Sequence, residues 1–433
     1  MPVLTIVTKY LTTLIEKSKH LKNIFSKFVH HIKKIRMQQV SDRLNRLTES
    51  ATIAMARKSR ELKAQGRDII SLSLGEPDFN TPDFIKEAAK QGIDQNYTKY
   101  MPVNGYEDLR DAISIKFKRD NDLSYSADQI VVSTGAKQSI ANVMMSLVNP
   151  GDEVIIPAPY WVTYADIVAL AEGIPVIIET SIDNDFKITA EELEAAITDK
   201  TRMMIYSSPC NPTGSLYSKD ELRRLADVIV KHENLLVTSD EIYEHINFVG
   251  KHESLAQFPD VYDQVITING VSKAFAMTGW RIGYIGAPEW IAQACTKMQG
   301  QITSGTCGIA QRAAIAAVLA NPSVTSEMKE AFHKRRDLVL GMLGKMEGVK
   351  INLPEGAFYV FPDISSFFGK SDGTTKVNNA DDLTIYILEK ANVALVTGAA
   401  FGAPNCIRIS YAASDTDLTE AMTRMGKVLS DLK

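Results

Sequence analysis

The sequence is poor in the features that mark disulfide-rich, membrane-spanning and strongly charged proteins. Its 433 residues include only four cysteines, which are widely scattered and form no C-x-x-C pair or Cys/His cluster. This argues against a disulfide framework and a structural zinc site and favours a reducing compartment, so we expect a cytoplasmic protein without a metal. No apolar run approaches the roughly 20 residues of a membrane-spanning helix. The formal net charge of −4 gives no sign of a nucleic-acid or membrane partner.

The chain also lacks a G-x-G-x-x-G motif at a strand-to-helix turn. Its absence removes the main argument for a nicotinamide-dependent dehydrogenase on a doubly wound sheet. There is no internal repeat and no low-complexity linker, and the length is sufficient for two domains.

Residues 1–40 differ in composition from the rest of the chain. Within residues 1–36, basic residues far outnumber the single acid, Glu16, and apolar residues recur at helical spacing. A transit peptide or a membrane-surface helix would share these features, but transit peptides are usually rich in arginine and this segment has only Arg36. We therefore interpret residues 1–40 as a basic extension outside the fold, dispensable and preceding a second candidate start at Met37.

Beyond residue 40, helical patterns alternate with short apolar runs typical of buried strands. The expected helices lie near 41–65, 83–93, 106–120, 136 onward, 161–173, 190–198 and 218–232. The expected strands are 69–75, 129–135, 153–159, 175–180, 202–208, 235–241 and 264–270. From about residue 323, long helices are joined by expected strands at 357–364, 393–398 and 406–412.

This alternation predicts an α/β fold with a mostly parallel sheet of the seven-stranded type, sandwiched by helices, over residues 81–322. Residues 41–80 and 323–433 are expected to form a smaller α+β domain, built from both ends of the chain. In open α/β sheets, ligands bind beyond the carboxyl ends of the strands, so the polar residues that follow strands are the candidates for function.

Polar motifs follow four of the predicted strands: STGAKQ, SSPCNPTG, TSDEIY and NGVSKAF. Taken singly, each has an ordinary explanation, such as a tight turn, a turn asparagine, a helix-capping aspartate or a solvated lysine. In the first motif, the backbone N–H groups of Gly135, Ala136 and Lys137 would lie at a helix N-terminus, which suits a phosphate. Asn211 would project from another strand end, with a rigid Pro-Gly turn behind it.

The other two motifs offer a carboxylate and an amine. Asp240 closes an apolar strand, where a carboxylate is costly to bury without a cation, and Tyr243 would share its face if the chain turns helically. Lys273 has small or apolar neighbours that would desolvate its amine and lower its pKa, as a Schiff-base lysine requires. Arg281 is far enough along the chain to reach a phosphate. The four motifs together describe one ligand, a phosphorylated pyridine aldehyde: pyridoxal phosphate.

The ordered motifs GEPDF, KYxPxxGxxxLR, PYW, NPTG, SDEIY, SKAFAMTGWRIGY and IRISYA resemble those of the class I aminotransferases. These are fold type I pyridoxal-phosphate enzymes, and the sequence looks most similar to their bacterial aspartate aminotransferase branch. The resemblance covers about residues 41–425, and seven motifs in order are far more specific than any one of them.

The resemblance implies a catalytic role for three residues. Lys273 matches the lysine that forms an aldimine with the cofactor and later moves the substrate's α-proton. Asp240 matches the aspartate that keeps the pyridine nitrogen protonated. Tyr243, together with Asn211, matches the pair that hydrogen-bonds the ring oxygen, and Trp161 matches the aromatic residue that stacks on the ring.

The resemblance also implies phosphate and substrate contacts. Arg408 matches the arginine that grips the substrate α-carboxylate as a bidentate fork, beside the backbone of Gly75. Trp161 and Asn211 are expected to contact the substrate as well. The phosphate would be held by Gly135, Ala136, Lys137, Ser272 and Arg281, and by Tyr100 from the partner subunit.

The enzyme implied is a homodimer with shared active sites that passes the amino group of an L-amino acid, aspartate by branch resemblance, to 2-oxoglutarate in a ping-pong reaction. A preference for aromatic amino acids, alanine or prephenate, or a β-lyase activity, is also open. A transcription regulator with an aminotransferase-like domain would need a DNA-binding module, and residues 1–40 are too short for a winged helix-turn-helix.

Two positions depart from the family pattern. Gly270 stands where relatives carry a phosphate-binding serine, although Ser272 adjoins the lysine and could substitute in part. Thr48 and Glu49 stand where some bacterial relatives carry a lysine, just ahead of Ser50–Thr52. No motif therefore supplies a cation for the second carboxylate of aspartate.

Overall fold

The computed structural model describes residues 40–433 and divides the chain into two compact units, Met1–Leu47 and Thr48–Lys433. The predicted basic extension, residues 1–40, lies outside the described residues apart from Val40. In the first unit the described part contains the short helix α3 (Asp42–Asn45). The hydroxyl of Ser41 caps this helix by accepting a hydrogen bond from the N–H of Leu44 at 3.3 Å.

The single helix predicted near 41–65 is wrong, because two helices occupy this stretch. Helix α3 ends at Asn45, and α4 (Ala51–Ala64) begins after Ser50, whose backbone is not helical. Before it, Thr48 donates hydrogen bonds from its backbone N–H and its hydroxyl to the carboxylate of Asp166 at 3.2–3.3 Å. This contact across 118 positions overrides the local helical preference.

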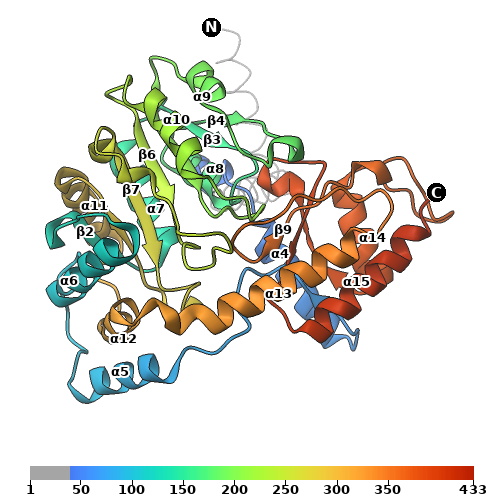
Figure 1. Ribbon diagram of the computed structural model, residues 1–433, viewed down its shortest axis with the longest axis horizontal. Coiled ribbons are helices and arrows are strands. Elements are labelled where there is room, and N and C mark those ends of the chain that lie inside the picture. The colour runs from blue at the N-terminus through green and yellow to red at the C-terminus, as the bar shows by residue number, and fades with distance from the viewer. Residues whose placement is uncertain (1–39) are drawn as a thin grey trace, which may run out of the picture. The chain divides into compact units, whose positions relative to one another are not determined.

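A seven-stranded sheet forms the centre of the second unit (Figure 1). In spatial order its strands are β2 (Ile130–Ser133), β8 (Gly283–Gly286), β7 (Val265–Gly270), β6 (Leu236–Asp240), β5 (Thr201–Ser207), β3 (Glu153–Pro157) and β4 (Ile174–Ile178). The five strands from β7 to β4 are parallel, while β8 runs antiparallel to both of its neighbours. Strand β2 therefore points the same way as the five. The predicted α/β class with a mostly parallel sheet is confirmed.

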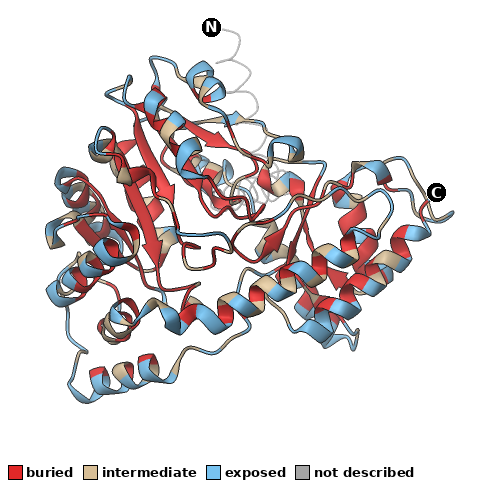
Figure 2. Ribbon diagram, in the orientation of Figure 1, coloured by how far each residue is buried: buried red, intermediate tan, exposed pale blue. Residues whose placement is uncertain are grey.

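Helices cover both faces of this sheet. Alternate side chains of β5 enter different cores, with Met203 and Ile205 on one face and Met204 and Tyr206 on the other. The first core is closed by α7 (Ala136–Leu147), α8 (Thr163–Leu170) and α11 (Glu289–Ile302). The second is closed by α5 (Asp83–Asp94), α6 (Glu107–Lys116), α9 (Ala190–Ala196), α10 (Lys219–Ile229) and α12 (Gly308–Leu319). Figure 2 shows the strands buried between them.

Strand β8 is not evident in the sequence pattern. Its residues, GYIG, are few and rich in glycine, which weakens strand propensity. The structure explains Gly283: a Cβ there would lie 2.5 Å from the carbonyl carbon of Gly135 and would collide with the backbone nitrogen of Ala136. The first turn of α7 therefore packs directly against the backbone of β8.

The rest of the second unit brings distant parts of the chain together. Strand β1 (Ile70–Ser71) pairs in parallel with β10 (Val393–Ala394). The strands β11 (Val396–Thr397), β12 (Ile407–Ser410) and β9 (Tyr359–Val360) form an antiparallel sheet. One apolar cluster joins these strands to α13 (Ser326–Leu343), α14 (Ala380–Ala391) and α15 (Asp415–Ser430). In Figure 1, α13 extends from beside α12 to α15.

The predicted division of the chain into a larger and a smaller domain is not tested by this arrangement. Residues 48–433 form one compact unit. The larger domain at 81–322, and the smaller one made of 41–80 and 323–433, therefore stay a prediction. Strands β1 and β10, which pair across more than 300 positions, are consistent with both chain ends meeting.

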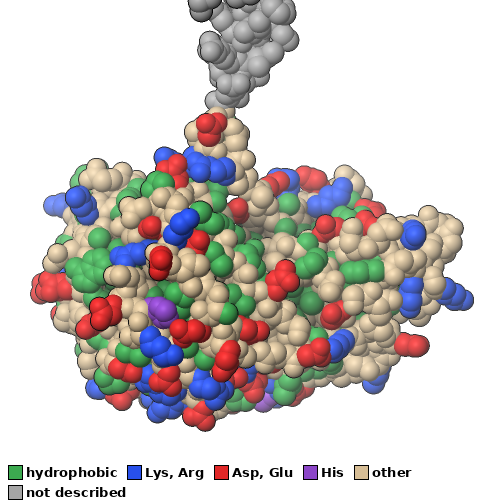
Figure 3. Space-filling view, turned by 90° about the horizontal axis from the view of Figure 1, so that it is seen from above, with side chains coloured by type: hydrophobic (Ala, Val, Ile, Leu, Met, Phe, Trp, Pro, Cys, Tyr) green, Lys and Arg blue, Asp and Glu red, His purple; other side chains and the backbone are tan. Residues whose placement is uncertain are grey.

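The surface of the described residues carries mixed charge. Basic and acidic side chains are interspersed on the face shown in Figure 3. Many form local ion pairs, such as that of Arg223 with Asp227 and Asp260. Among residues 40–433, no helix combines the length and the apolar character needed to cross a membrane.

We expect Gly283→Ala to reduce the free energy of unfolding by about 1–3 kcal/mol, the usual cost of overpacking a close-packed interior. The added methyl group would push the first turn of α7 away from β8. Gly341→Ala is the matched control, because Gly341 is exposed within α13 and a Cβ there meets nothing within 4 Å. That change should stabilise the protein by about 0.5–1 kcal/mol. Urea unfolding of the two variants measures the difference, and equal stabilities would contradict the packing described.

Candidate active site

The four polar motifs predicted at strand ends converge at one edge of the sheet. Strands β2, β5, β6 and β7 run in the same direction, so their carboxyl ends share that edge. A cavity of about 260 Å³ lies there. The predicted site residues that line it are Gly75, Ala136, Lys137, Trp161, Asn211, Asp240, Tyr243, Ser272, Lys273, Arg281 and Arg408.

Two predicted residues are not part of the cavity lining. Gly135 is the N-cap residue of α7, with a φ of +84°, and a side chain there would collide with the guanidinium of Arg281. Both the backbone conformation and the close approach therefore require glycine. Tyr100 is fully exposed. Its role in the site of a partner subunit stays a prediction.

Lys273 follows β7 and extends its amine into the cavity. Its Nζ donates a hydrogen bond to the carbonyl oxygen of Gly75 at 2.5 Å and lies 5.7 Å from the centre of the Tyr243 ring. Burial, with the positive charge of Arg408 nearby, lowers the pKa of Lys273 to about 8. A large fraction of the amine is thus neutral in mildly alkaline solution, as a nucleophile or base requires.

Asp240 ends β6 and is buried. The Tyr164 hydroxyl donates to its Oδ2 at 2.7 Å, and the N–H of Ile242 donates to its Oδ1 at 3.3 Å. Burial raises the pKa of the Asp240 carboxyl to about 6, although both hydrogen bonds favour the ionised form. These donors are neutral groups, so the carboxylate is placed to receive a cation from a ligand.

Arg408, in β12, is only 1% exposed and lies between aromatic rings. Its Nη1 donates to Oδ1 of Asn211 at 3.0 Å, and its Nη2 donates to the carbonyl oxygen of Ser73 at 2.5 Å. Its Nε is buried without a hydrogen-bond partner. Since these partners are neutral, the guanidinium can bind a carboxylate from a ligand as a planar fork.

Aromatic side chains form much of the cavity wall. The hydroxyl groups of Tyr243 and Tyr359 lie 2.7 Å apart, and burial next to Tyr359 raises the pKa of Tyr243 well above its usual value. Trp161 meets Tyr164 edge to face, with 5.7 Å between ring centres. Flat apolar walls with hydroxyl groups at their edges suit a ring-shaped ligand that carries polar substituents.

Positive charge gathers where α7 begins. Helix α7 starts at Ala136, and the first N–H groups of a helix have no partner within it. Ser272 and Arg281 line the cavity with Ala136, and Nη1 of Arg281 donates to the carbonyl oxygen of Thr278 at 2.8 Å. Burial and the charge of Arg281 lower the pKa of Lys137. This combination of a helix N-terminus and cationic side chains suits a phosphate.

The glycine at position 270 has a packing reason. A Cβ on Gly270 would lie 2.8 Å from the carbonyl oxygen of Ile282 and 3.0 Å from the Cα of Gly283. A serine would not fit without moving β7 away from this backbone. Ser272 lines the cavity instead.

Sequence reasoning missed several residues of the cavity. Tyr164, which binds Asp240, gives a partial signal because it lies three residues after Trp161. Tyr359, which contacts Tyr243, gives none, because its partner is 116 positions away. The other missed lining residues are Ser50, Thr52, Ile53, Thr163, Ser207, Ile242 and Thr278.

The described groups fit a phosphorylated pyridine aldehyde. An amine of lowered pKa, a buried carboxylate with neutral partners and a cationic helix N-terminus surround one cavity. One polar atom near it, Nε of Arg408, is buried without a hydrogen-bond partner, as expected where a ligand supplies one. The arrangement can bond an aldehyde at Lys273 and hold a carboxylate at Arg408.

Comparison with known sequences supports this assignment. Residues 67–425 match the family described as aminotransferase class I and II. A bifunctional aspartate aminotransferase and glutamate/aspartate-prephenate aminotransferase of Petunia hybrida is 47% identical over 399 residues, covering 91% of this chain and 83% of the relative. An aspartate/prephenate aminotransferase of Cereibacter sphaeroides is 48% identical over 392 residues, covering 90% and 98%.

Solved structures show the same fold. The aspartate aminotransferase of Rhizobium meliloti superposes with a TM-score of 0.89 at 41% identity, covering 91% of this chain and all of that one. The aspartate aminotransferase of Thermus thermophilus with maleate gives a TM-score of 0.85 at 38% identity, covering 90% of this chain and all of that one. The chain therefore belongs to the class I and II aminotransferases, whose class I members depend on pyridoxal phosphate.

Proposed function

We propose that this chain is a pyridoxal-phosphate-dependent aspartate aminotransferase, which passes the amino group of L-aspartate to 2-oxoglutarate in a ping-pong reaction. The observation that carries the proposal is the convergence of Lys273 and Asp240 on one cavity that Arg408 also lines. Similarity to relatives named aspartate aminotransferases supports the choice of aspartate.

When bound, pyridoxal phosphate supplies a reactive aldehyde and a protonated ring that takes up the electrons of a carbanion. Asp240 holds the proton on the ring nitrogen, because a buried carboxylate with neutral partners favours a cation beside it. With the cofactor bound, Lys273 would hold its aldehyde carbon in the resting enzyme. When the substrate is bound instead, the neutral Nζ would serve as the base that moves the proton from the substrate α-carbon to that carbon of the cofactor.

The remaining residues bind and orient. Tyr243 and Asn211 donate hydrogen bonds to the ring oxygen, and Trp161 stacks on the ring. Arg408 binds the α-carboxylate of the substrate beside the backbone of Gly75. The phosphate is bound by Ser272, Arg281 and the backbone N–H groups of Gly135, Ala136 and Lys137.

Aspartate and 2-oxoglutarate each need a second cation for their second carboxylate. Four cationic side chains line the cavity: Lys137, Lys273, Arg281 and Arg408. With Lys273 as base, Arg281 at the phosphate and Arg408 at the α-carboxylate, the ammonium of Lys137 is available for the second carboxylate. It lies 4.8 Å from the centre of the Trp161 ring. Lys137 contributes its backbone to the phosphate site and its side chain to the substrate, so the two roles are compatible.

Prephenate is a second candidate acceptor. The relatives from Petunia and Cereibacter carry prephenate in their names. Prephenate is also a 2-oxo acid with two carboxylates, so Arg408 and Lys137 can serve it as they serve 2-oxoglutarate. Product assays distinguish an aminotransferase from a β-lyase, because transamination of aspartate releases oxaloacetate whereas a β-lyase releases ammonia and pyruvate from cysteine derivatives.

We also propose a homodimer in the cytoplasm. Tyr100 is fully exposed, and the large apolar side chains of Phe84, Ile93 and Ile302 are between 42% and 60% exposed, so each is available for contact with a second copy. Tyr100 of the partner subunit then completes the phosphate site. All four cysteines are free thiols, which suits a reducing compartment. Light scattering of the purified protein tests the dimer.

Half-reaction spectra test the function. Protein loaded with pyridoxal phosphate should show a visible absorption band, and L-aspartate alone should shift it while oxaloacetate appears. Borohydride reduction should mark Lys273 covalently, and Lys273→Ala should abolish that label. A band that responds to alanine or phenylalanine as strongly as to aspartate would remove the aspartate assignment and leave the cofactor assignment intact.

Lys137→Met should reduce kcat/KM for aspartate by about 10- to 150-fold, the loss expected for one hydrogen bond to a charged group. The value for alanine, which has no second carboxylate, should stay close to that of the unchanged enzyme. Lys86→Met, at a half-buried lysine paired with Asp83 outside the cavity lining, is the control and should affect neither substrate. Equal losses for aspartate and alanine would show that Lys137 does not bind the second carboxylate.

The rate at which cofactor-free protein takes up pyridoxal phosphate should rise with pH around a midpoint near the Lys273 pKa of about 8. Only the neutral amine attacks an aldehyde, and lowering the pH protonates it. Stopped-flow absorbance measures this rate. Pyridoxine phosphate, which lacks the aldehyde, is the control ligand, and its binding should not show that midpoint. An uptake rate independent of pH across this range would exclude Lys273 as the titrating group.

A further inference from the structure

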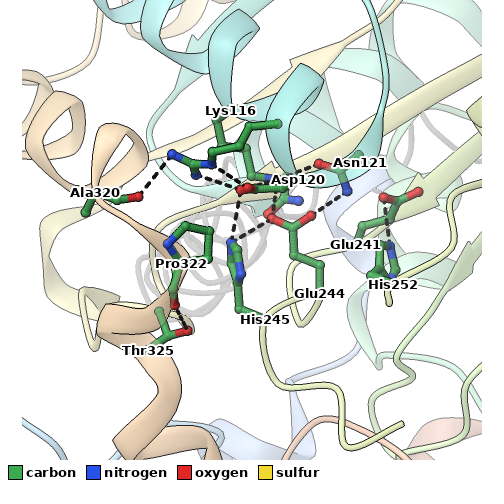
Figure 4. A network of polar contacts seen from close by, with 12 residues as sticks. Lys116, Asp120, Asn121, Glu241, Glu244, His245, His252, Ala320, Pro322 and Thr325 are labelled. Atoms are coloured by element: carbon green, nitrogen blue, oxygen red, sulfur yellow. Dashed lines mark hydrogen bonds and ion pairs between the residues drawn. The ribbon is translucent and has the colours of Figure 1, made fainter. Parts of the chain in front are cut away.

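The segment 240–245 carries two sets of side chains. Asp240 and Tyr243 line the cavity, whereas Glu241, Glu244 and His245 belong to a separate buried polar network (Figure 4). No step of the proposed reaction uses this network. It is built from residues far apart in the sequence, and it adjoins both the strand end that carries Asp240 and the turn that carries Tyr243.

Glu244 is the centre of the network. Its carboxylate forms an ion pair with the ammonium of Lys116, accepts a hydrogen bond from Nδ2 of Asn121 at 2.7 Å and lies 3.2 Å from Nε2 of His245. Burial alone would raise the pKa of Glu244, but Lys116 and His245 hold it well below its usual range. Glu244 is therefore a buried carboxylate that is ionised and closely held.

The partners of Glu244 come from an irregular segment. Helix α6 ends at Lys116 and continues as one π-helical turn, Phe117–Asn121, which is followed by Asp122 in the left-handed conformation. Lys116 also donates to Oδ1 of Asn121 at 2.8 Å. π-Helical turns are rare and occur frequently near functional sites. Here the turn brings Lys116, Asp120 and Asn121 to one buried cluster.

A second branch holds Glu241. Its carboxylate lies 2.9 Å from Nε2 of His252 and accepts hydrogen bonds from the hydroxyl groups of Ser239 and Ser254 at 2.9 and 2.7 Å. One carboxylate oxygen each of Glu241 and Glu244 and one ring nitrogen of His252 lie within 4.8 Å of one another. The two branches therefore form one cluster, and Lys116 supplies it with a cation.

Stability alone does not explain such a cluster, since a buried ion pair often stabilises a protein no more than apolar residues of the same volume. The position of the cluster beside the cavity explains it better. Residues 242–245 form turns rather than a helix or strand. Their backbone hydrogen bonds, from Glu244 to Glu241 and from Ile246 to Tyr243, are local, so the side chain of Glu244 supplies the link to the distant segment 116–121. The His245 ring also lies 6.1 Å, centre to centre, from Phe275, two residues beyond Lys273. The network thus contacts both segments that carry the proposed catalytic residues.

We propose that Lys116 and Glu244 are positioning residues of the active site. Their ion pair fixes the turn that carries Tyr243, directly after Asp240 at the end of β6, and, through His245 and Phe275, supports the loop that carries Lys273. Neither residue lines the cavity. The inference rests on the proposed function, because it concerns how that site is held in place.

The test is the double variant Lys116→Gln/Glu244→Gln, which removes both charges of the pair together and leaves the buried carboxylate of Asp120 paired with Arg119. We expect kcat for aspartate to fall about 10- to 100-fold, with little change in KM, because small displacements of catalytic groups are costly. The dissociation constant for pyridoxal phosphate should rise, measured by fluorescence titration of the cofactor-free protein. The pH midpoint of the visible band should also shift. A network that serves only stability would move neither of the last two.

The matched control is Lys187→Gln/Glu221→Gln. This pair is 2.7 Å apart and partly buried, and neither residue lines the cavity. It should lower the melting temperature while leaving kcat, cofactor affinity and the spectral midpoint unchanged. Should the Lys116/Glu244 double variant fail to fold, Glu244→Asp keeps the charge, shortens the side chain and should show the same three effects in weaker form.

A folded Lys116/Glu244 variant with the kcat, cofactor affinity and spectral midpoint of the unchanged enzyme would overturn the inference, as would an unaffected Glu244→Asp. These outcomes leave the proposed function standing. An unchanged enzyme that forms no visible band with pyridoxal phosphate would instead overturn the proposed function, and the inference with it.

Discussion

The structure depends most on the burial of one carboxylate, that of Asp240, at the end of a central strand. Taking a carboxylate out of water is costly unless a cation or several donors compensate. Tyr164 and the N–H of Ile242 compensate only in part, since the pKa of Asp240 still rises to about 6. A positively charged ligand would offset the rest of this desolvation cost, so the fold favours a protonated heterocycle beside Asp240. The proposed cofactor satisfies that demand.

The sheet order explains how the other groups reach the same cavity. Strands β5, β6 and β7 are neighbours and parallel, so the residues that follow them share one edge. Strand β2 contributes from beyond β8, and the antiparallel course of β8 keeps the end of β2 on that edge. Because Gly283 and Gly270 carry no side chains, β7, β8 and the start of α7 approach closely. The helix N-terminus and Arg281 are thereby brought beside Lys273.

Sequence reasoning captured what local pattern encodes. Apolar runs indicated six of the seven central strands, and the polar residues after them led to Asn211, Asp240 and Lys273. It failed where contacts between distant residues determine the local structure. The hydrogen bonds of Thr48 to Asp166 interrupt the helix predicted near 41–65, and β8 is too rich in glycine to resemble a strand. Helices α11 and α12 were not predicted, because no polar motif at the end of a predicted strand leads into them. The pairing of Tyr359 with Tyr243, and of Lys116 with Glu244, joins segments whose separation no periodicity reveals.

The charges of the cavity also link substrate binding to catalysis. Lys137, Arg281 and Arg408 line it with Lys273, and Asp240 is the acid among the lining residues. Burial first, and then the charges of Arg408 and Arg281, lower the pKa of Lys273. The cations that bind anionic ligands thus help to keep the amine of the cofactor-free protein neutral and reactive. When a carboxylate occupies Arg408 and a phosphate occupies Arg281, those charges are balanced and their effect on the Lys273 pKa weakens. A higher pKa would make the lysine a stronger base for the α-proton that we propose it takes.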